Sequence, residues 1–194
     1  MYKILNDALT ETQSLLQALQ SDQERQDSLI SLASQIAEVF QRGGKLIIFG
    51  NGGSMCDAMH LAEELTGRFH SDRPALPAIA ISDPGHLSCV ANDYGYEMVF
   101  TRGVEAYANA GDLLIGISTS GNSENVIKGL EAGIAKECFT AALLGKDGGK
   151  LKDLCDFPII VPSQNTARIQ EVHGLIIHVL IEMVEKELFG EVVK

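Results

Sequence analysis

The stretch KLIIFGNGGSMCDAMHLAEELTGR, residues 45–68, decides the fold of this chain. It opens with a continuous apolar run at 45–49, passes through the glycine-rich GNGGS at 50–54, and continues as helical sequence from Met55 to about Arg68. A short, continuous apolar run followed by a long helix is typical of a strand that is buried on both faces. The stretch therefore predicts the strand, tight loop and helix from which parallel α/β sheets are built.

The same alternation continues to the end of the chain. Short apolar runs predict further strands at 77–81, 113–118, 140–145 and 157–161. Helical sequence runs from about Glu124 to Lys136 and from about Ala167 to Phe189. The stretch that ends at Asn109 is mixed and indicates no single element. We expect an α/β fold with a mostly parallel central sheet covered by helices on both faces.

Two amphipathic helices are expected before the first strand. Apolar residues recur at helical spacing through residues 1–20 and again from Leu29 to Phe40. Ser21-Asp22 interrupts the pattern, and Gly43-Gly44 ends it. We expect one domain over 1–194, with a helical pair at 1–43 and an α/β core with a long final helix at 44–194, since 194 residues suit a single domain.

Charge and composition exclude several classes of partner. The chain has 15 Lys and Arg against 26 Asp and Glu, a net charge of −11 at pH 7. Nucleic acids and anionic membranes reward clustered positive charge, so neither is expected as a partner. The four cysteines show no CxxC spacing, no apolar leader opens the sequence, and no apolar stretch reaches the ~18–20 residues of a membrane span. We expect a cytoplasmic protein with reduced thiols.

Two glycine- and serine-rich loops follow predicted strands. In open α/β sheets, ligands bind beyond the carboxyl ends of the strands, where both loops are expected to lie. The glycines of GNGGS allow close approach of a ligand, and Ser54 is placed to cap the following helix. The loop contains neither GxGxxG nor GK[ST], so it predicts no dinucleotide or nucleoside triphosphate site. An ordinary tight turn remains an equal alternative for this loop alone.

The second loop, STSGNS at 118–123, is more specific. It gathers the hydroxyls of Ser118, Thr119, Ser120 and Ser123 immediately before a helix. A simple helix cap needs one hydroxyl, whereas several hydroxyls beside helix N-terminal amides form a cradle for phosphate. The loop therefore predicts a phosphate site.

His60 and Glu64 are candidates for acid–base or metal chemistry. They lie four residues apart on the helix after GNGGS, so both face the same side and could share a metal ion or a substrate. Glu63 competes for the carboxylate role, and an exposed helix pair is the commoner outcome of such spacing. Taken alone, the spacing does not decide between these alternatives.

The final helix carries further polar candidates within an apolar sequence. His173 and His178 point to different faces, and core packing is the favoured interpretation of both. Gln170 and His178 lie ~80° apart around the helix and ~12 Å along it, so they converge on one centre only if their side chains lean together. For Arg73, solvated surface is the expected environment. Asn92-Asp93, in VANDYGY, reads as an Asx turn.

The combined motifs resemble the phosphoheptose isomerase family, which belongs to the sugar-isomerase (SIS) domain superfamily. The resemblance runs over nearly the whole chain through GNGGS, CDAMHLAEELTGR, PAIAIS, ANDYGY, GISTSGNSENVIK, LLGKDGG and ARIQEVH. STSGNS alone is similar to the wider superfamily, and the residues His60, Glu64, Gln170 and His178 narrow the resemblance to the isomerases. It implies the three-layer α-β-α SIS fold with two N-terminal helices.

The resemblance also implies a set of site residues. Its phosphate loop corresponds to Ser118, Thr119, Ser120 and Ser123. Its remaining substrate contacts correspond to Asn51, Gly52, Gly53, Ser54, Glu64, Asn92, Asp93 and Gln170. Its zinc ligands correspond to His60, Glu64, Gln170 and His178. Its catalytic acid–base pair corresponds to Glu64 and His178.

The reaction implied is the isomerisation of sedoheptulose 7-phosphate to D-glycero-D-manno-heptose 7-phosphate through an enediol, the first step toward nucleotide-activated heptose. Glu64 would be the base and His178 the acid, with one zinc per subunit of a homotetramer whose sites lie at subunit contacts. A carboxylate cannot easily be a tight ligand and a free base together, so either the ligation shifts during turnover or the zinc is mainly structural. A cross-subunit site would also relieve the spacing of Gln170 and His178.

A non-catalytic SIS module is the alternative. Such a module would bind a phosphosugar or a protein partner such as a replication initiator. The relative that binds an initiator shares GNGGS, STSGNS and ARIQEVH, but by resemblance it lacks the histidine equivalent to His178. The presence of His178 favours the enzyme.

Overall fold

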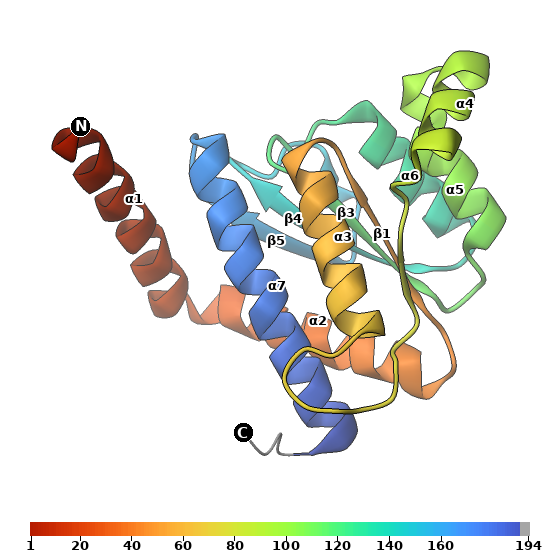
Figure 1. Cartoon of the computed structure of the whole chain (residues 1–194), viewed down its shortest axis with the longest axis horizontal. Coiled ribbons are helices and arrows are strands. Elements are labelled where there is room, and N and C mark those ends of the chain that lie inside the picture. The colour runs from red at the N-terminus through yellow and green to blue at the C-terminus, as the bar shows by residue number, and fades with distance from the viewer. Residues whose placement is uncertain (191–194) are drawn as a thin grey trace.

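All strands of the central sheet run parallel. The computed structural model describes residues 1–190, and its five strands are ordered β2-β1-β3-β4-β5 (Figure 1). The strands are β1 (Leu46–Gly50), β2 (Ala78–Ala80), β3 (Leu113–Ser118), β4 (Phe139–Gly145) and β5 (Phe157–Val161). The chain leaves β1 toward β2 on one side and returns to β3 on the other, so the order reverses between β1 and β3. Ligands bind at such a reversal in open α/β sheets.

Helices cover both faces of the sheet. They are α1 (Tyr2–Ser21), α2 (Gln23–Gln41), α3 (Gly53–Thr66), α4 (Pro84–Tyr94), α5 (Val99–Tyr107), α6 (Glu124–Ala135) and α7 (Thr166–Phe189), with short 3₁₀ turns at Tyr96–Met98 and Leu151–Asp153. In Figure 1, α3 and α7 lie in front of the sheet, and α4, α5 and α6 lie on its other side. The predicted three-layer fold with two leading helices is confirmed.

Alternate residues of each strand pack into hydrophobic clusters on opposite faces of the sheet. Both sets are therefore apolar, and the strand sequences are continuous apolar runs. In β1, Leu46 and Ile48 pack with side chains of α2, α3 and α7. Ile47 and Phe49 pack with side chains of α4, α5 and α6 on the opposite face. Since neither face meets water, polar alternation is absent from the sequence.

The mixed stretch before Asn109 folds into two short helices, α4 and α5. Asp83 caps α4, because its carboxylate accepts the backbone N–H of His86 at 2.7 Å. The predicted Asx turn at Asn92-Asp93 is wrong, since both residues lie in the last turn of α4. The helix ends there because Gly95 follows with a φ of +95°.

The helix α1 stands away from the rest of the molecule (Figure 1). It has no buried residue, and it is tied to the start of α7 by a hydrogen bond from Thr12 Oγ1 to Glu171 Oε2 of 3.0 Å. Its apolar stripe is largely exposed, at Ile4, Leu5, Leu9 and Leu16. This stripe is a surface without a partner in the described part of the chain.

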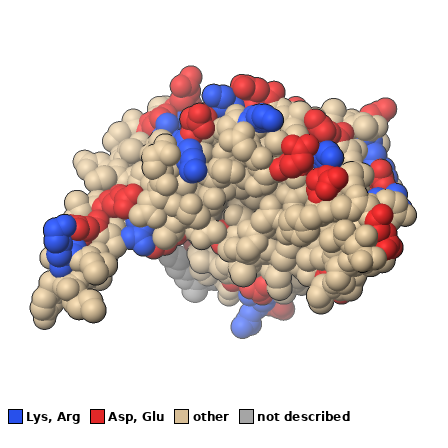
Figure 2. Space-filling view, turned by 90° about the horizontal axis from the view of Figure 1, so that it is seen from above, with Lys and Arg blue, Asp and Glu red and all other residues tan. Residues whose placement is uncertain are grey.

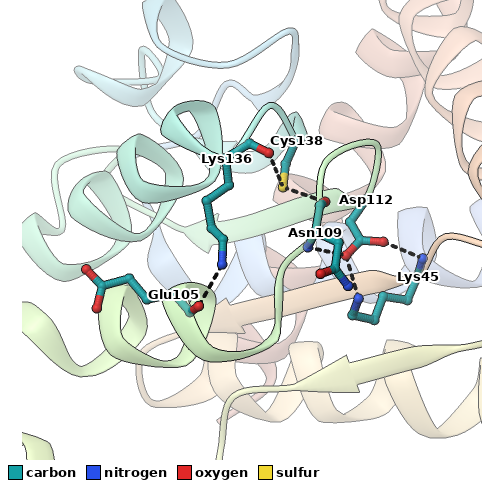
Figure 3. A network of polar contacts seen from close by, with 6 residues as sticks. All are labelled: Lys45, Glu105, Asn109, Asp112, Lys136 and Cys138. Atoms are coloured by element: carbon teal, nitrogen blue, oxygen red, sulfur yellow. Dashed lines mark hydrogen bonds and ion pairs between the residues drawn. The ribbon is translucent and has the colours of Figure 1, made fainter.

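A half-buried ion pair between Lys45 and Asp112 lies at the amino edge of the sheet (Figure 3). The carboxylate of Asp112, just before β3, accepts the backbone N–H of Lys45 at 3.0 Å and the Lys45 Nζ at 2.5 Å. It also accepts the backbone N–H of Asn109 at 2.8 Å. These bonds join the beginnings of β1 and β3.

Candidate functional site

The helices α3 and α7 pack against each other, and both begin at the carboxyl edge of the sheet (Figure 1). They therefore run side by side in the same direction. Residues at matching depth along the two helices face each other, and this arrangement brings candidate residues from distant parts of the sequence together.

His60, Glu64 and His178 form one cluster between these helices. The Nε2 atoms of His60 and His178 are 3.3 Å apart, and His60 Nε2 lies 3.4 Å from Glu64 Oε1. One ligand atom of each residue lies within 4.8 Å of the others. The cluster is half-buried, so its polar atoms reach solvent while the helices hold their positions. Core packing, which the helical pattern alone favours for His178, is therefore wrong, and the site role that the resemblance implies stays a prediction.

The donor set of this cluster fits a zinc ion. Zn²⁺ binds histidine nitrogens and carboxylate oxygens at about 2.0–2.2 Å in tetrahedral geometry, which places neighbouring ligand atoms roughly 3.3–3.5 Å apart. The separations of 3.3 Å and 3.4 Å that His60 makes to His178 and Glu64 match this spacing. The site is therefore compatible with zinc, and its occupancy stays a prediction.

Gln170 lies at a different level of the same helix pair. Its side-chain amide covers Gly53 at the start of α3, so closely that a Cβ on Gly53 would lie 2.3 Å from Gln170 Nε2. A side chain at position 53 would therefore displace the Gln170 amide. The side chain thus meets the predicted substrate loop, about 12 Å along α7 from His178. Its assignment as a metal ligand stays a prediction.

Two neighbours of the cluster were not predicted from sequence. The ring of Phe69, after α3, stacks on His178 with 5.5 Å between centroids. Asp57 lies one turn before His60, and burial raises the pKa of its carboxyl while His60 partly lowers it. Neither residue carries a motif, and helical spacing from His60 is the one signal that could have indicated Asp57.

Arg73 is buried, so the expectation of solvated surface is wrong. Its side chain is 5% exposed and that of Glu185, on α7, is 1% exposed. Arg73 Nε donates to Glu185 Oε1 at 2.7 Å. The partner lies more than a hundred positions away in sequence, which is why local reasoning missed it.

The STSGNS loop gathers its hydroxyls at the carboxyl end of β3. Ser118 Oγ lies 3.0 Å from Ser123 Oγ and 3.4 Å from Ser120 Oγ, and Thr119 is half-buried beside them. Ser123 occupies the N-cap position of α6, but its side chain makes no capping bond. The hydroxyls therefore face one another beside a helix N-terminus, as a phosphate cradle requires.

This loop is braced by a second glycine-rich turn. Gly121 has a φ of +65°, and a Cβ there would lie 2.0 Å from the carbonyl oxygen of Gly148. Asn122 Oδ1 accepts the backbone N–H of Lys150 at 3.2 Å. The backbone of 146–150 thus fixes the shape of the serine loop.

Asn51 links the two loops. Its side-chain amide exchanges two hydrogen bonds of 2.8 Å with that of Asn125 on α6, and Tyr96 donates its hydroxyl to Asn51 Oδ1 at 3.0 Å. A hollow of about 600 Å³ opens here, with Asn51, Tyr96 and Ser123 in its wall. A predicted sugar contact and a predicted phosphate contact therefore border one space, and Tyr96 and Asn125, which sequence reasoning did not single out, line it as well.

The remaining predicted substrate contacts occupy distinct places. Gly52 is the N-cap of α3 with a φ of +57° and open space beside it. Ser54 lies buried in the first turn of α3, so the expectation that it caps this helix is wrong. Asn92 and Asp93 are exposed at the end of α4, bonded to each other by Asn92 Nδ2 to Asp93 Oδ1 at 2.7 Å. Their role in binding stays a prediction.

His173 is a core residue, as the sequence predicts. It is fully buried, and its Nε2 lies 3.0 Å from the carbonyl oxygen of Leu144. Burial lowers the pKa of its imidazole to about 4, and the bond to Leu144 offsets this only in part. The ring is therefore neutral near pH 7.

Known proteins resemble this chain in sequence and in structure. Residues 9–145 match the SIS domain family. The phosphoheptose isomerase of Fusobacterium nucleatum is 51% identical over 97% of this chain and 96% of its own, and that of Vibrio cholerae is 53% identical over 97% and 100%. The solved structure of phosphoheptose isomerase GmhA from Neisseria gonorrhoeae superposes with a TM-score of 0.89 at 35% identity, over 95% of this chain and 98% of that one.

Proposed function

Since the chain belongs to the SIS-domain family and to its phosphoheptose isomerase branch, we propose that it converts sedoheptulose 7-phosphate to D-glycero-D-manno-heptose 7-phosphate. The observation that carries the chemistry is the cluster of His60, Glu64 and His178 between two helices that start at the edge bearing the serine loop. The reaction moves a carbonyl between C2 and C1 through an enediol. It requires a base for a carbon-bound proton and an acid at the developing oxyanion.

The serine loop anchors the 7-phosphate. The hydroxyls of Ser120 and Ser123 lie 3.4 Å and 3.0 Å from that of Ser118. They can donate to phosphate oxygens without a lysine or arginine, and the start of α6 adds the positive end of its dipole. Anchoring the remote end of the sugar positions C1 and C2. The substrate then loses its freedom of movement on binding and not on reaching the transition state, which lowers the barrier.

Glu64 and His178 manage the protons. The Glu64 carboxylate takes the proton from the carbon next to the carbonyl, and the His178 imidazole holds and returns a proton at the adjacent oxygen. Both are half-buried beside solvent, so the pair can reset after each turnover. His60 lies against both partners and orients them. Zinc, when bound by His60, Glu64 and His178, would polarise the substrate carbonyl as a Lewis acid. Gln170, about 12 Å away along α7, would join these ligands only from another subunit.

We infer a homotetramer as the working form. Two observations support a self-association surface. The apolar stripe of α1 is exposed, and Met59 and Leu175 are exposed on α3 and α7. Figure 2, seen from above Figure 1, shows a broad area without charged side chains in its lower half, on the side of α3 and α7. Light scattering of the purified protein measures the assembly directly, and a monomer would contradict it.

We propose the cytoplasm as its location, where sugar phosphates are made and used. No helix within residues 1–190 is both long and apolar enough to cross a membrane. The product would enter synthesis of nucleotide-activated heptose. The net charge of −11 argues against nucleic acid as a partner.

NMR of the protein with sedoheptulose 7-phosphate in D₂O tests the reaction. Aldoheptose 7-phosphate carrying deuterium at C2 is the expected product of an enediol route. The experiment is repeated after a chelator and again after Zn²⁺ is restored. Loss of turnover on chelation and recovery with Zn²⁺ would establish the metal as essential, whereas unchanged turnover would contradict a catalytic zinc.

The non-catalytic alternative predicts a different spectrum. A sensor or partner-binding module would perturb the phosphate resonance but yield neither product nor deuterium exchange. The relatives of 51% and 53% identity are named as isomerases, which favours the enzyme.

A further inference from the structure

We propose that Arg73 is a positioning residue for the isomerase reaction, and that with Glu185 and Phe69 it forms a clamp that sets Glu64 and His178 against each other. This inference rests on the proposed function, because it assigns a catalytic consequence to residues outside the site. The three residues come from the connection after α3 and from α7, and none of them belongs to a predicted site. Arg73, Glu185 and Phe69 together form the Arg73 clamp.

The guanidinium of Arg73 binds the end of α3. Its Nη2 donates to the carbonyl oxygen of Glu64 at 2.7 Å, and its Nη1 donates to those of Leu65 at 2.7 Å and Gly67 at 3.1 Å. A helix leaves its last four carbonyls without intrahelical partners. Arg73 supplies donors to two of them, and its positive charge complements the C-terminal end of the helix dipole. The turn that carries Glu64 is therefore fixed by Arg73.

The same guanidinium holds α7. Arg73 Nε donates to Glu185 Oε1 at 2.7 Å. Glu185 follows His178 by two helical turns, so the two side chains project from nearly the same face of α7, about 10 Å apart along its axis. Locking Glu185 to Arg73 fixes the rotation and the depth of α7 relative to α3. At this setting His178 lies against His60 and Glu64.

Phe69 makes the third contact. The connection that leads from α3 to Arg73 places the Phe69 ring on the His178 imidazole, with an interplanar angle of 28° and centroids 5.5 Å apart. The imidazole is thus held between Phe69 on one side and the edge of His60, whose ring lies at 86° to it. Because Arg73 anchors this connection to Gly67 and Glu185, it also sets where Phe69 lies.

Stability alone does not account for this arrangement. Removing two opposite charges from water carries a desolvation penalty that their mutual attraction barely offsets. Proteins in which such a pair is replaced by well-packed apolar side chains are often as stable or more stable. Arg73 makes directional hydrogen bonds to three backbone carbonyls at the end of α3 and to the carboxylate of Glu185. Apolar side chains cannot make such bonds. Since displacements near 1 Å can cost about 100-fold in rate, such a link has a catalytic consequence.

Steady-state kinetics of Glu185→Gln and Arg73→Lys test the clamp. Lysine keeps the charge but cannot reach Glu185, Glu64 and Leu65 at once. We expect kcat to fall about 10- to 100-fold in both variants. KM should stay within about threefold, because the phosphate loop lies on β3 and α6. The matched control is Asp112→Asn, which breaks the half-buried Lys45–Asp112 pair in front of β1 and β3 (Figure 3), a pair in which no residue of the Arg73 clamp takes part. It should lose stability and keep kcat.

The double variant Arg73→Met with Glu185→Leu separates positioning from stability. Removing both charges should return the unfolding midpoint to that of the unmodified protein or above it. We expect kcat to remain depressed. Recovery of kcat together with stability would overturn the clamp, as would a kcat within twofold of normal in Glu185→Gln. An equal loss of kcat in Asp112→Asn would do the same.

A readout without substrate keeps this inference separate from the proposed reaction. In protein labelled with ¹³C in the histidine rings, the clamp variants should shift the resonances of His178 and leave those of the buried His173 in place. Unshifted His178 resonances would overturn the clamp. If the unmodified protein forms no product while the shifts appear, the proposed reaction fails and the positioning role stands.

Discussion

The imidazole Nε2 atoms of His60 and His178 lie 3.3 Å apart although 118 positions separate the residues in sequence. The parallel course of α3 and α7 produces this contact, since both helices begin at the same edge of the sheet and pack together. Gly53 meets Gln170 near the start of the pair, and Arg73 joins the end of α3 to Glu185 farther along. The chemistry of the site depends on the register of these two helices.

Replacing Glu64 by glutamine should abolish most turnover and keep substrate binding. The amide retains the size of the carboxylate but cannot take a proton, and general bases contribute about 10²–10⁴ in rate. We expect kcat to fall by that factor, measured as deuterium incorporation from D₂O. Glu63→Gln is the control, because Glu63 is an exposed neighbour. A near-normal rate in Glu64→Gln would remove the assignment of the base.

Ser120→Ala should weaken phosphate binding more than it slows the chemistry. Its hydroxyl lies in the loop that faces the predicted phosphate, and a hydrogen bond to a charged group contributes about 1.5–3 kcal/mol. We expect KM for the sugar phosphate to rise roughly 10- to 100-fold. Ser88→Ala is the control, since Ser88 Oγ donates to the Gly85 carbonyl on α4 at 3.1 Å. An unchanged KM would count against the phosphate cradle.

Gly121→Ala should disrupt the serine loop more than Gly111→Ala disturbs its own turn. Both glycines have positive φ, at +65° and +85°, so alanine strains either backbone by about 1–2 kcal/mol. At Gly121 the added Cβ would also lie 2.0 Å from the carbonyl oxygen of Gly148, whereas at Gly111 nothing lies within 4 Å. We expect a raised KM for Gly121→Ala alone. Equal KM values in the two variants would show that the brace is not needed.

Stability should decline in mild acid through His173. Burial lowers the pKa of its imidazole from 6.5 to about 4 in the folded protein. As the pH falls below 6.5, the unfolded chain takes up a proton that the folded chain refuses until near pH 4. Stability is therefore highest above the unfolded pKa, and the free energy of unfolding should fall by about 3 kcal/mol between pH 7 and 4.

Urea unfolding at several pH values measures this effect. In His173→Gln, which has a side chain that can still donate to the Leu144 carbonyl but does not titrate, the pH dependence over the same range should be shallower. Identical slopes in the two proteins would assign the acid sensitivity to other groups.

Much of the fold could be predicted because its signals are local. The apolar run and glycine-rich loop of 45–54 predict β1 and the start of α3, and the strand expected at 157–161 coincides with β5. Asp22 ends one helix and caps the next by accepting the backbone N–H of Arg25 at 3.1 Å. The helices α4 and α5 were not predicted, because at 11 and 9 residues each spans too few turns for a helical repeat to stand out from the sequence around it.

The sequence by itself determined the parallel sheet, its two loops and the residue types that carry the chemistry. Strand burial, turn formation and the spacing of apolar residues in a helix depend on residues close together in sequence, so short stretches of sequence are enough to predict them. Only the tertiary structure decided which of these residues meet. Helical pattern alone did not separate His178 from the core residue His173, although the family resemblance did. Nothing in the sequence separated Arg73 from a surface residue; its contact with Glu185 on α7 did. Contacts between distant segments depend on how whole elements pack, and no local pattern records that.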